Sequence, residues 1–192
     1  GGKLGKGAAK GGGKTGKKRK VAYAARSSKL KRTKAALPRE QSRIGIIHTC
    51  GTLPAVGYGA EVSGVTNTEL WNMQVPQLSH RAPSHKGCNH KVKLAIWGDP
   101  CWREALAPVI RFCTEMWLAM VHDPSAQFSI AELNHMWDEA YAQKNRSWRS
   151  SRGPLTALLL CLDRLGWKAK SITTWQDDNG VAVHLPDHSP QM

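Results

Sequence analysis

The sequence predicts a mainly α-helical body with a small C-terminal β-hairpin and a basic N-terminal arm. Three observations support this fold class. Apolar residues recur with helical spacing through much of residues 99–170. The pattern becomes alternating over residues 171–185, around Asn179-Gly180, a dipeptide typical of hairpin turns. The formal net charge of +14 arises in residues 1–43, which hold 15 Lys and Arg residues and one acidic residue.

The basic arm is expected to bind nucleic acid. Residues 1–20 are rich in Gly and Lys, so we expect them to be flexible, and they have no apolar stripe for a membrane surface. Residues 17–34 are denser in charge and could form a basic helix when docked. Lysines of this kind contact phosphates and release counterions without reading bases. The expected contact residues are Lys14, Lys17, Lys18, Arg19, Lys20, Arg26, Lys29, Lys31, Arg32, Lys34, Arg39 and Arg43.

Two other interpretations of the arm stay open at this point. It could be a solvated tail without a fixed partner, or the KKRK string at 17–20 could be a nuclear-import signal. Five cysteines without paired spacing indicate a reducing compartment, and the start carries no signal peptide or membrane span. We therefore expect a nuclear or other intracellular protein that is not secreted. Because the chain does not begin with Met, we also expect it to be part of a longer reading frame.

Capping signals place the first helices of the body. Thr66-Asn67-Thr68-Glu69 is a capping box flanked by the apolar pair Val65 and Leu70, and Pro76 is expected to end or kink the helix early. Asp99-Pro100 is expected to open a helix that continues to His122, in which Pro108 would be a kink or a second start.

Two further helices and the hairpin follow. Ser129 to Glu132 is a second capping box, before a helix with Trp137 and Tyr141 on its apolar face. Gly153-Pro154 opens the last helix, Gly166 suits the left-handed residue after its end, and Trp167 can fold back onto it. Its apolar stripe is Leu155, Leu158, Leu159, Leu162 and Leu165.

The expected segments are the arm (1–20), a basic helix with a further helical segment (21–80), a polar linker (81–98), a helical core (99–170), the hairpin (171–185) and a tail (186–192).

The sequence contains no group of residues that we expect to form a catalytic site. Asp177-Asp178 leads into Asn179-Gly180 and is interpreted as a turn, because two-metal chemistry would need a third carboxylate nearby. The weak metal candidates are His80, His85, Cys88 and His90. Their spacing does not match a known zinc-binding motif, and a polar loop explains them better. Cys101, Cys113 and Cys161 are expected to be small core residues. We expect no enzyme activity, no cofactor and no small-molecule substrate for this chain alone.

A second basic cluster surrounds Trp148. Arg146, Arg149 and Arg152 flank this tryptophan just before a helix start, an arrangement that could stack a base and hold a phosphate. The alternative is a loop tryptophan that covers the edge of the core, and this alternative is favoured.

Four strings, in this order, resemble the region after the polymerase palm in non-LTR retroelement reverse transcriptases, of the kind encoded by dinoflagellate algae. They are Pro54-x3-Tyr58-Gly59-x-Glu61-Val62, Leu94-x2-Trp97-Gly98-Asp99-Pro100-x-Trp102-Arg103, Arg152-Gly153-Pro154-Leu155-x2-Leu158-Leu159 and Leu165-Gly166-Trp167. The resemblance spans roughly residues 17–185. It implies a thumb-like segment in which Tyr58 and Glu61, one turn apart on a helix, tie that helix to its neighbour.

The resemblance also implies a function without catalysis. The catalytic palm would precede Gly1, so this chain would grip primer–template or target duplex through phosphate contacts. Two alternatives are a free-standing chromatin or RNA-binding module with a histone-like arm, and a decayed retroelement remnant.

Overall fold

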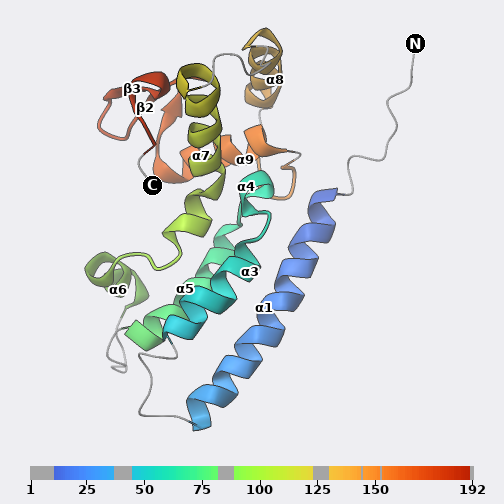
Figure 1. The fold of residues 1–192 in the computed structure, drawn as a ribbon, viewed down its shortest axis with the longest axis vertical. Coiled ribbons are helices and arrows are strands. Elements are labelled where there is room, and N and C mark those ends of the chain that lie inside the picture. The colour runs from blue at the N-terminus through green and yellow to red at the C-terminus, as the bar shows by residue number, and fades with distance from the viewer. Residues whose placement is uncertain are drawn as a thin grey trace. The chain divides into compact units, whose positions relative to one another are not determined.

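The computed structural model describes residues 11–36, 45–81, 89–122, 130–143, 145–151 and 153–190 (Figure 1). The chain divides into two compact units, which we describe separately. Unit 1 comprises Gly1–Gly59 and Val65–Ala105, and unit 2 comprises Ala60–Gly64 and Leu106–Met192. The described elements are mostly helices, with one three-stranded sheet near the C-terminus, so the predicted fold class is confirmed.

Unit 1 is helical in its described part. Its elements are α1 (Gly11–Ala36), the π-helical turn η2 (His48–Thr52), α3 (Leu53–Gly57), α5 (Asn67–Arg81), α6 (His90–Trp97) and the first residues of α7 (Trp102–Trp117). Helix α1 packs against η2 and α3.

Helix α1 begins at Gly11, inside the segment expected to be a flexible arm. One of its faces is packed: Arg19 and Leu30 are buried, and Tyr23 and Ser27 are half-buried. These positions are spaced three or four residues apart and therefore share one side of the helix. Packing of this face stabilises a helix that glycine propensity alone disfavours.

The capping box at the start of α5 is confirmed. The Glu69 amide donates to Thr66 Oγ1 at 3.1 Å, and Glu69 Oε2 accepts from the Thr66 amide at 3.0 Å. Val65 and Leu70 are both buried beside it, at 2% and 6% exposure, as a hydrophobic staple requires.

Of the two outcomes expected at Pro76, an early helix end is wrong, because α5 continues to Arg81 with Pro76 inside it. A proline nitrogen has no hydrogen, so Pro76 cannot donate to the carbonyl of Asn72 four residues earlier. The Tyr23 hydroxyl of α1 donates to this same carbonyl. A contact from 49 residues away in the sequence thus compensates for the proline.

The expected polar linker at 81–98 also needs correction. Residues 82–88 lie outside the described residues, but His90–Trp97 forms helix α6. Asn89 is its N-cap, and the Asn89 side chain accepts from the Lys91 amide at 2.8 Å. The sequence has no Glu or Gln three residues after Asn89, so the capping-box signal that marked α5 is missing here.

Asp99-Pro100 precedes α7 as expected, but Asp99 is not its N-cap: Asp99 Oδ1 accepts from the Cys101 amide at 2.8 Å and forms a turn just before the helix. The helix runs from Trp102 to Trp117 with Pro108 inside it, so Pro108 does not start a second helix.

Unit 2 contains α4 (Ala60–Ser63), most of α7, the π-helical turn η3 (Leu118–His122), α8 (Ile130–Ala142) and α9 (Pro154–Leu165). The strands β1 (Lys168–Ala169), β2 (Thr174–Gln176) and β3 (Ala182–His184) and the short 3₁₀ turn η4 (Leu185–Asp187) follow. The sheet is antiparallel in the order β1-β2-β3, with Trp175 opposite both Ala169 and Val183. The second capping box begins at Ser129, which lies outside the described residues.

The core of unit 2 forms around α9, as the leucine stripe predicts. Leu158, Leu159 and Leu162 are each at most 2% exposed and cluster with Trp137 and Trp175. Further apolar residues of α7 and α8 pack against this cluster, namely Val109, Phe112, Cys113, Leu133 and Ala140. Gly166 adopts the left-handed conformation (φ 76°), and the Trp167 amide donates to the Leu162 carbonyl at 3.0 Å.

Candidate nucleic-acid interface

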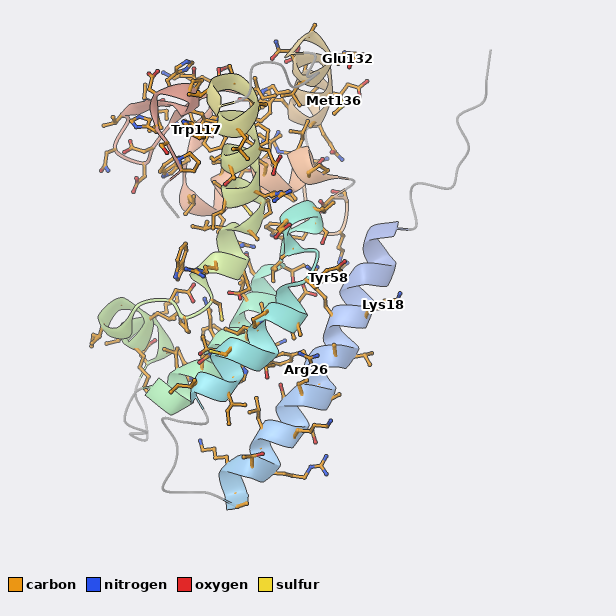
Figure 2. All side chains as sticks on the ribbon, in the orientation of Figure 1. Lys18, Arg26, Tyr58, Trp117, Glu132 and Met136 are labelled. Carbon is orange, nitrogen blue, oxygen red and sulfur yellow. The ribbon has the colours of Figure 1, made fainter. Side chains whose placement is uncertain are left out.

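The outward face of α1 carries exposed cations. Lys18, Lys29, Lys31 and Arg32 are exposed, and Lys34 is half-buried. The helix holds ten Lys and Arg residues and no acidic residue. Figure 2 labels Lys18 and Arg26 on this helix. These cations lie along one helix whose other face is packed, so the helix sets their backbone spacing.

Arg26 has a structural contact in addition to its exposure. Its Nη1 donates to the Gly51 carbonyl at 2.8 Å and so connects α1 to η2. Arg26 therefore orients the helix as well as adding charge to its surface.

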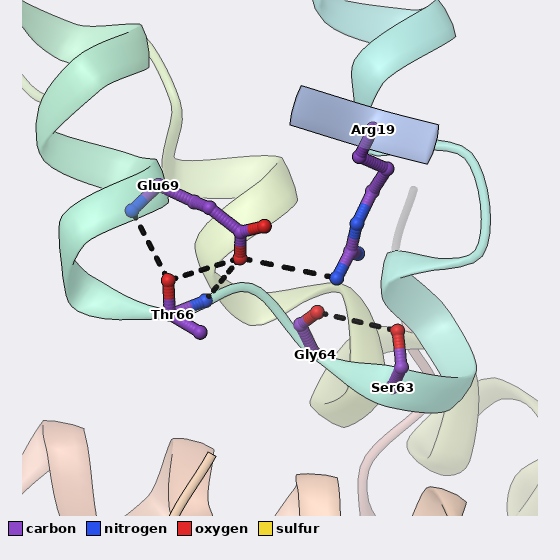
Figure 3. A network of polar contacts seen from close by, with 5 residues as sticks. All are labelled: Arg19, Ser63, Gly64, Thr66 and Glu69. Carbon is purple, nitrogen blue, oxygen red and sulfur yellow. Dashed lines mark hydrogen bonds and ion pairs between the residues drawn. The ribbon is translucent and has the colours of Figure 1, made fainter. Parts of the chain in front are cut away.

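Arg19 belongs to the packed face of α1. It is only 9% exposed, and its Nη2 lies 3.9 Å from Glu69 Oε2 (Figure 3). The expectation that Arg19 lies on the exposed phosphate-binding surface is therefore corrected, and we leave it out of the interface. The side chains of Lys14, Lys17 and Lys20 in α1 are outside the described residues, as are Arg39 and Arg43.

The second basic cluster is tied into unit 2. Arg146 Nη2 lies 3.7 Å from Asp163 Oδ2, and Arg146 Nη1 donates to the Tyr141 carbonyl at 3.0 Å. Trp148 is half-buried, its ring packs against Gly64, and the Arg164 guanidinium stacks 4.6 Å from its centroid. Arg149 is exposed, and Arg152 lies outside the described residues. This geometry favours the interpretation of Trp148 as a cover for the core edge.

The expectation that Tyr58 and Glu61 lie one turn apart on the same helix is wrong. Tyr58 follows α3 with non-helical angles (φ −53°, ψ 125°) and is 83% exposed, while Glu61 is exposed in α4. Pro54 lies in the first turn of α3, and Gly59 has a positive φ of 75°. Glycine at this position permits the turn that separates Tyr58 from α4, so the two side chains do not share a helix.

The acidic turn is confirmed. Asp177 Oδ1 accepts from the Asn179 amide at 3.0 Å and from the Val181 amide at 2.7 Å. Gly180 supplies the positive φ of 87°. Asp177 thus closes the hairpin.

The weak metal candidates are only partly described. The His80 side chain, His85 and Cys88 are outside the described residues, while the His90 ring lies 5.3 Å from that of Trp71. Within the described part of the chain, no group of three or more His, Cys, Asp or Glu residues could hold a metal ion.

The cysteines of unit 2 behave as core residues. Burial raises the pKa of the Cys113 and Cys161 thiols to about 11. At neutral pH both thiols are protonated and therefore poor nucleophiles. This agrees with their expected role in packing.

A cavity of about 280 Å³ lies in unit 1 between α1, α3 and α5. It is lined by Arg19, Tyr23, Val56, Val65, Thr68, Glu69, Asn72 and Met73. The sequence analysis missed this site, because its lining comes from three separated segments and no local motif marks it. The sequence contains one signal for this site: Arg19 and Tyr23 are four residues apart and so lie on the same face of α1.

Comparison with known proteins adds no assignment. No family model, no curated protein and no solved structure matches the chain. In the described part of the chain, no helix is both long and apolar enough to cross a membrane.

Proposed function

We propose that this chain is the non-catalytic, nucleic-acid-binding part of a reverse-transcriptase-like protein, and that it grips duplex nucleic acid through phosphate contacts from α1. The observation that carries the proposal is the division of α1 into two faces. One face packs on η2 and α3, while Lys18, Lys29, Lys31 and Arg32 are exposed along a helix without acidic residues.

The dimensions of this row suit a duplex. Lys18 and Arg32 are 14 residues apart, which corresponds to roughly 21 Å along a helix. That length covers about two-thirds of a turn of B-form DNA, whose turn is about 34 Å. Lysine is a compact point charge on a flexible stem, so such a row holds the backbone and does not discriminate sequences.

The four sequence strings support a reverse-transcriptase context, with primer–template or target duplex as the partner. The KKRK string at 17–20 supports a nuclear location.

The first test replaces three exposed cations of α1 by glutamine: Lys29→Gln, Lys31→Gln and Arg32→Gln together. Each lost phosphate contact should reduce the slope of log K against log salt by about 0.9 on B-form DNA. We therefore expect the triple variant to reduce the slope by about 2.7 and to weaken binding equally on unrelated sequences. Fluorescence anisotropy with labelled duplexes over a salt series measures both.

The matched control neutralises three exposed lysines elsewhere, Lys91→Gln, Lys168→Gln and Lys170→Gln. It removes the same charge and should leave the slope nearly unchanged. Equal losses in both variants would mean that overall charge, rather than α1, determines affinity. Point variants are preferable to removal of α1, because deletion would uncover the surface that buries Leu30.

The second test concerns catalysis. We expect the purified chain to show no primer extension with Mg²⁺ or Mn²⁺, because Asp177 is engaged by the backbone of its turn. A primer-extension gel checks this result. Extension that is lost with Asp177→Asn and Asp178→Asn would contradict the non-catalytic assignment.

A further inference from the structure

The cavity in unit 1 has two chemically different sides. Val56, Val65 and Met73 are at most 6% exposed and form an apolar wall. Tyr23, Arg19 and Glu69 bring an aromatic ring, a guanidinium and a carboxylate to the same space. At about 280 Å³ the cavity is just below the usual range of ligand pockets, roughly 300–1,000 Å³, so it suits a single small ring system.

The polar side offers donors next to an acceptor. Arg19 and Glu69 have side chains only 10% and 11% exposed, and their charged atoms lie 3.9 Å apart (Figure 3). Glu69 Oε2 accepts from the amide and the hydroxyl of Thr66, both at 3.0 Å. Among the described residues, none donates to the other carboxylate oxygen, Oε1. One acceptor oxygen of Glu69 is therefore left for a ligand, beside the donor-rich guanidinium.

This arrangement selects a neutral group inside the cavity. A free phosphate would be attracted by the Arg19 guanidinium but repelled by the Glu69 carboxylate. A cation would be attracted by Glu69 but repelled by Arg19. A neutral, flat ring with a hydrogen-bond donor directly beside an acceptor would satisfy both side chains. The Tyr23 ring and the apolar wall would contact its faces, as aromatic residues do when they stack on bases.

We propose that this cavity binds a nucleobase that carries an exocyclic amino group beside a ring acceptor, namely adenine or cytosine. Adenine presents its N6 amino group next to N7, and cytosine presents its N4 amino group. The amino group donates to Glu69 Oε1, and the Arg19 guanidinium donates to the ring nitrogen. Hypoxanthine and uracil carry a carbonyl in place of that amino group, and this oxygen would face the carboxylate unfavourably.

The base could come from a free nucleotide or from an unpaired nucleotide in a strand held by α1. Only the second source rests on the proposed function, since it requires α1 to hold the strand. The recognition chemistry is the same for both.

The experiment compares bases that differ at this one group. Isothermal titration calorimetry of the full chain is performed with AMP against IMP and with CMP against UMP. We expect AMP and CMP to bind at least about tenfold more tightly than their carbonyl counterparts. For the strand source, the same comparison is made with RNA duplexes that carry one unpaired A, inosine, C or U.

Glu69→Gln tests the residue assignment. Glutamine can still serve in the capping box, so the start of α5 should be retained. With its amide oxygen on Thr66, its NH₂ group would face the cavity, and the preference for amino bases should disappear or invert. Glu61→Gln, which changes an exposed carboxylate of α4, should leave the preference intact. A circular dichroism melt of each variant verifies that it is folded.

The outcomes separate the two sources. A preference for amino bases among free nucleotides that Glu69→Gln removes supports the site with a free-nucleotide source. The same preference only in the unpaired-base duplexes supports a strand source. Absence of any preference in both formats, or a preference unchanged in folded Glu69→Gln, overturns the site. A failure of the proposed function appears differently, as duplex binding that is insensitive to the α1 triple variant.

Discussion

Replacing Leu159 by alanine should lower the free energy of unfolding of unit 2 by about 2–5 kcal/mol, because the change leaves a cavity in its core. Leu159 is 2% exposed and clusters with Trp137, Leu158, Leu162 and Trp175. Chemical denaturation followed by circular dichroism measures the loss. Leu118→Ala is the matched control, since Leu118 is 39% exposed on η3 and should cost much less. Equal stability of parent and Leu159→Ala would mean that α9 is not packed as the structure has it.

Gly64→Ala should destabilise the protein by roughly 2–5 kcal/mol, for two separate reasons. Gly64 has a positive φ of 65°, a conformation that L residues adopt at a cost. A Cβ at this position would also lie only 2.1 Å from Cζ3 of Trp148, a ring atom that must then move. Thermal and urea denaturation both report the loss.

Gly166→Ala separates these two causes. Gly166 has a similar positive φ of 76°, but a Cβ there would find its nearest neighbour at 3.9 Å, on Asp178. Gly166→Ala should lower the free energy of unfolding by about 1 kcal/mol, which is the cost of the backbone conformation alone. The difference between the two variants then measures the steric conflict with Trp148. A Gly64→Ala variant as mild as Gly166→Ala would show that the Trp148 ring is not held against Gly64.

Short-range sequence signals predicted the local structure well. The capping box at Thr66 to Glu69, the stripe of α9 and the turn at Asn179-Gly180 are each formed by residues within a few positions of one another. Their hydrogen bonds and spacing therefore follow from local geometry. The core of unit 2 followed from the same stripes, because an apolar helix face must be covered by another.

Long-range contacts explain what the sequence analysis missed. No local pattern predicts that Tyr23 reaches the Asn72 carbonyl, so proline at 76 alone predicts a break or a kink in the helix. Arg19 has the same charge as the exposed cations around it in the sequence, yet it lies against Glu69, 50 positions later. The candidate interface therefore keeps only part of the expected set, and the cavity beside Arg19 and Glu69 emerges only from the packing of α1 on unit 1.

The bond between Tyr23 and the Asn72 carbonyl also has a consequence for how this sequence can diverge. With proline at 76, the hydroxyl of Tyr23 donates to a carbonyl that has lost its usual amide donor four residues later in the helix. With any other residue at 76, a backbone amide would be available to that carbonyl and the hydroxyl would become dispensable. Positions 23 and 76 should therefore vary together among descendants of this chain: phenylalanine at 23 should be tolerated best where the proline has already been lost.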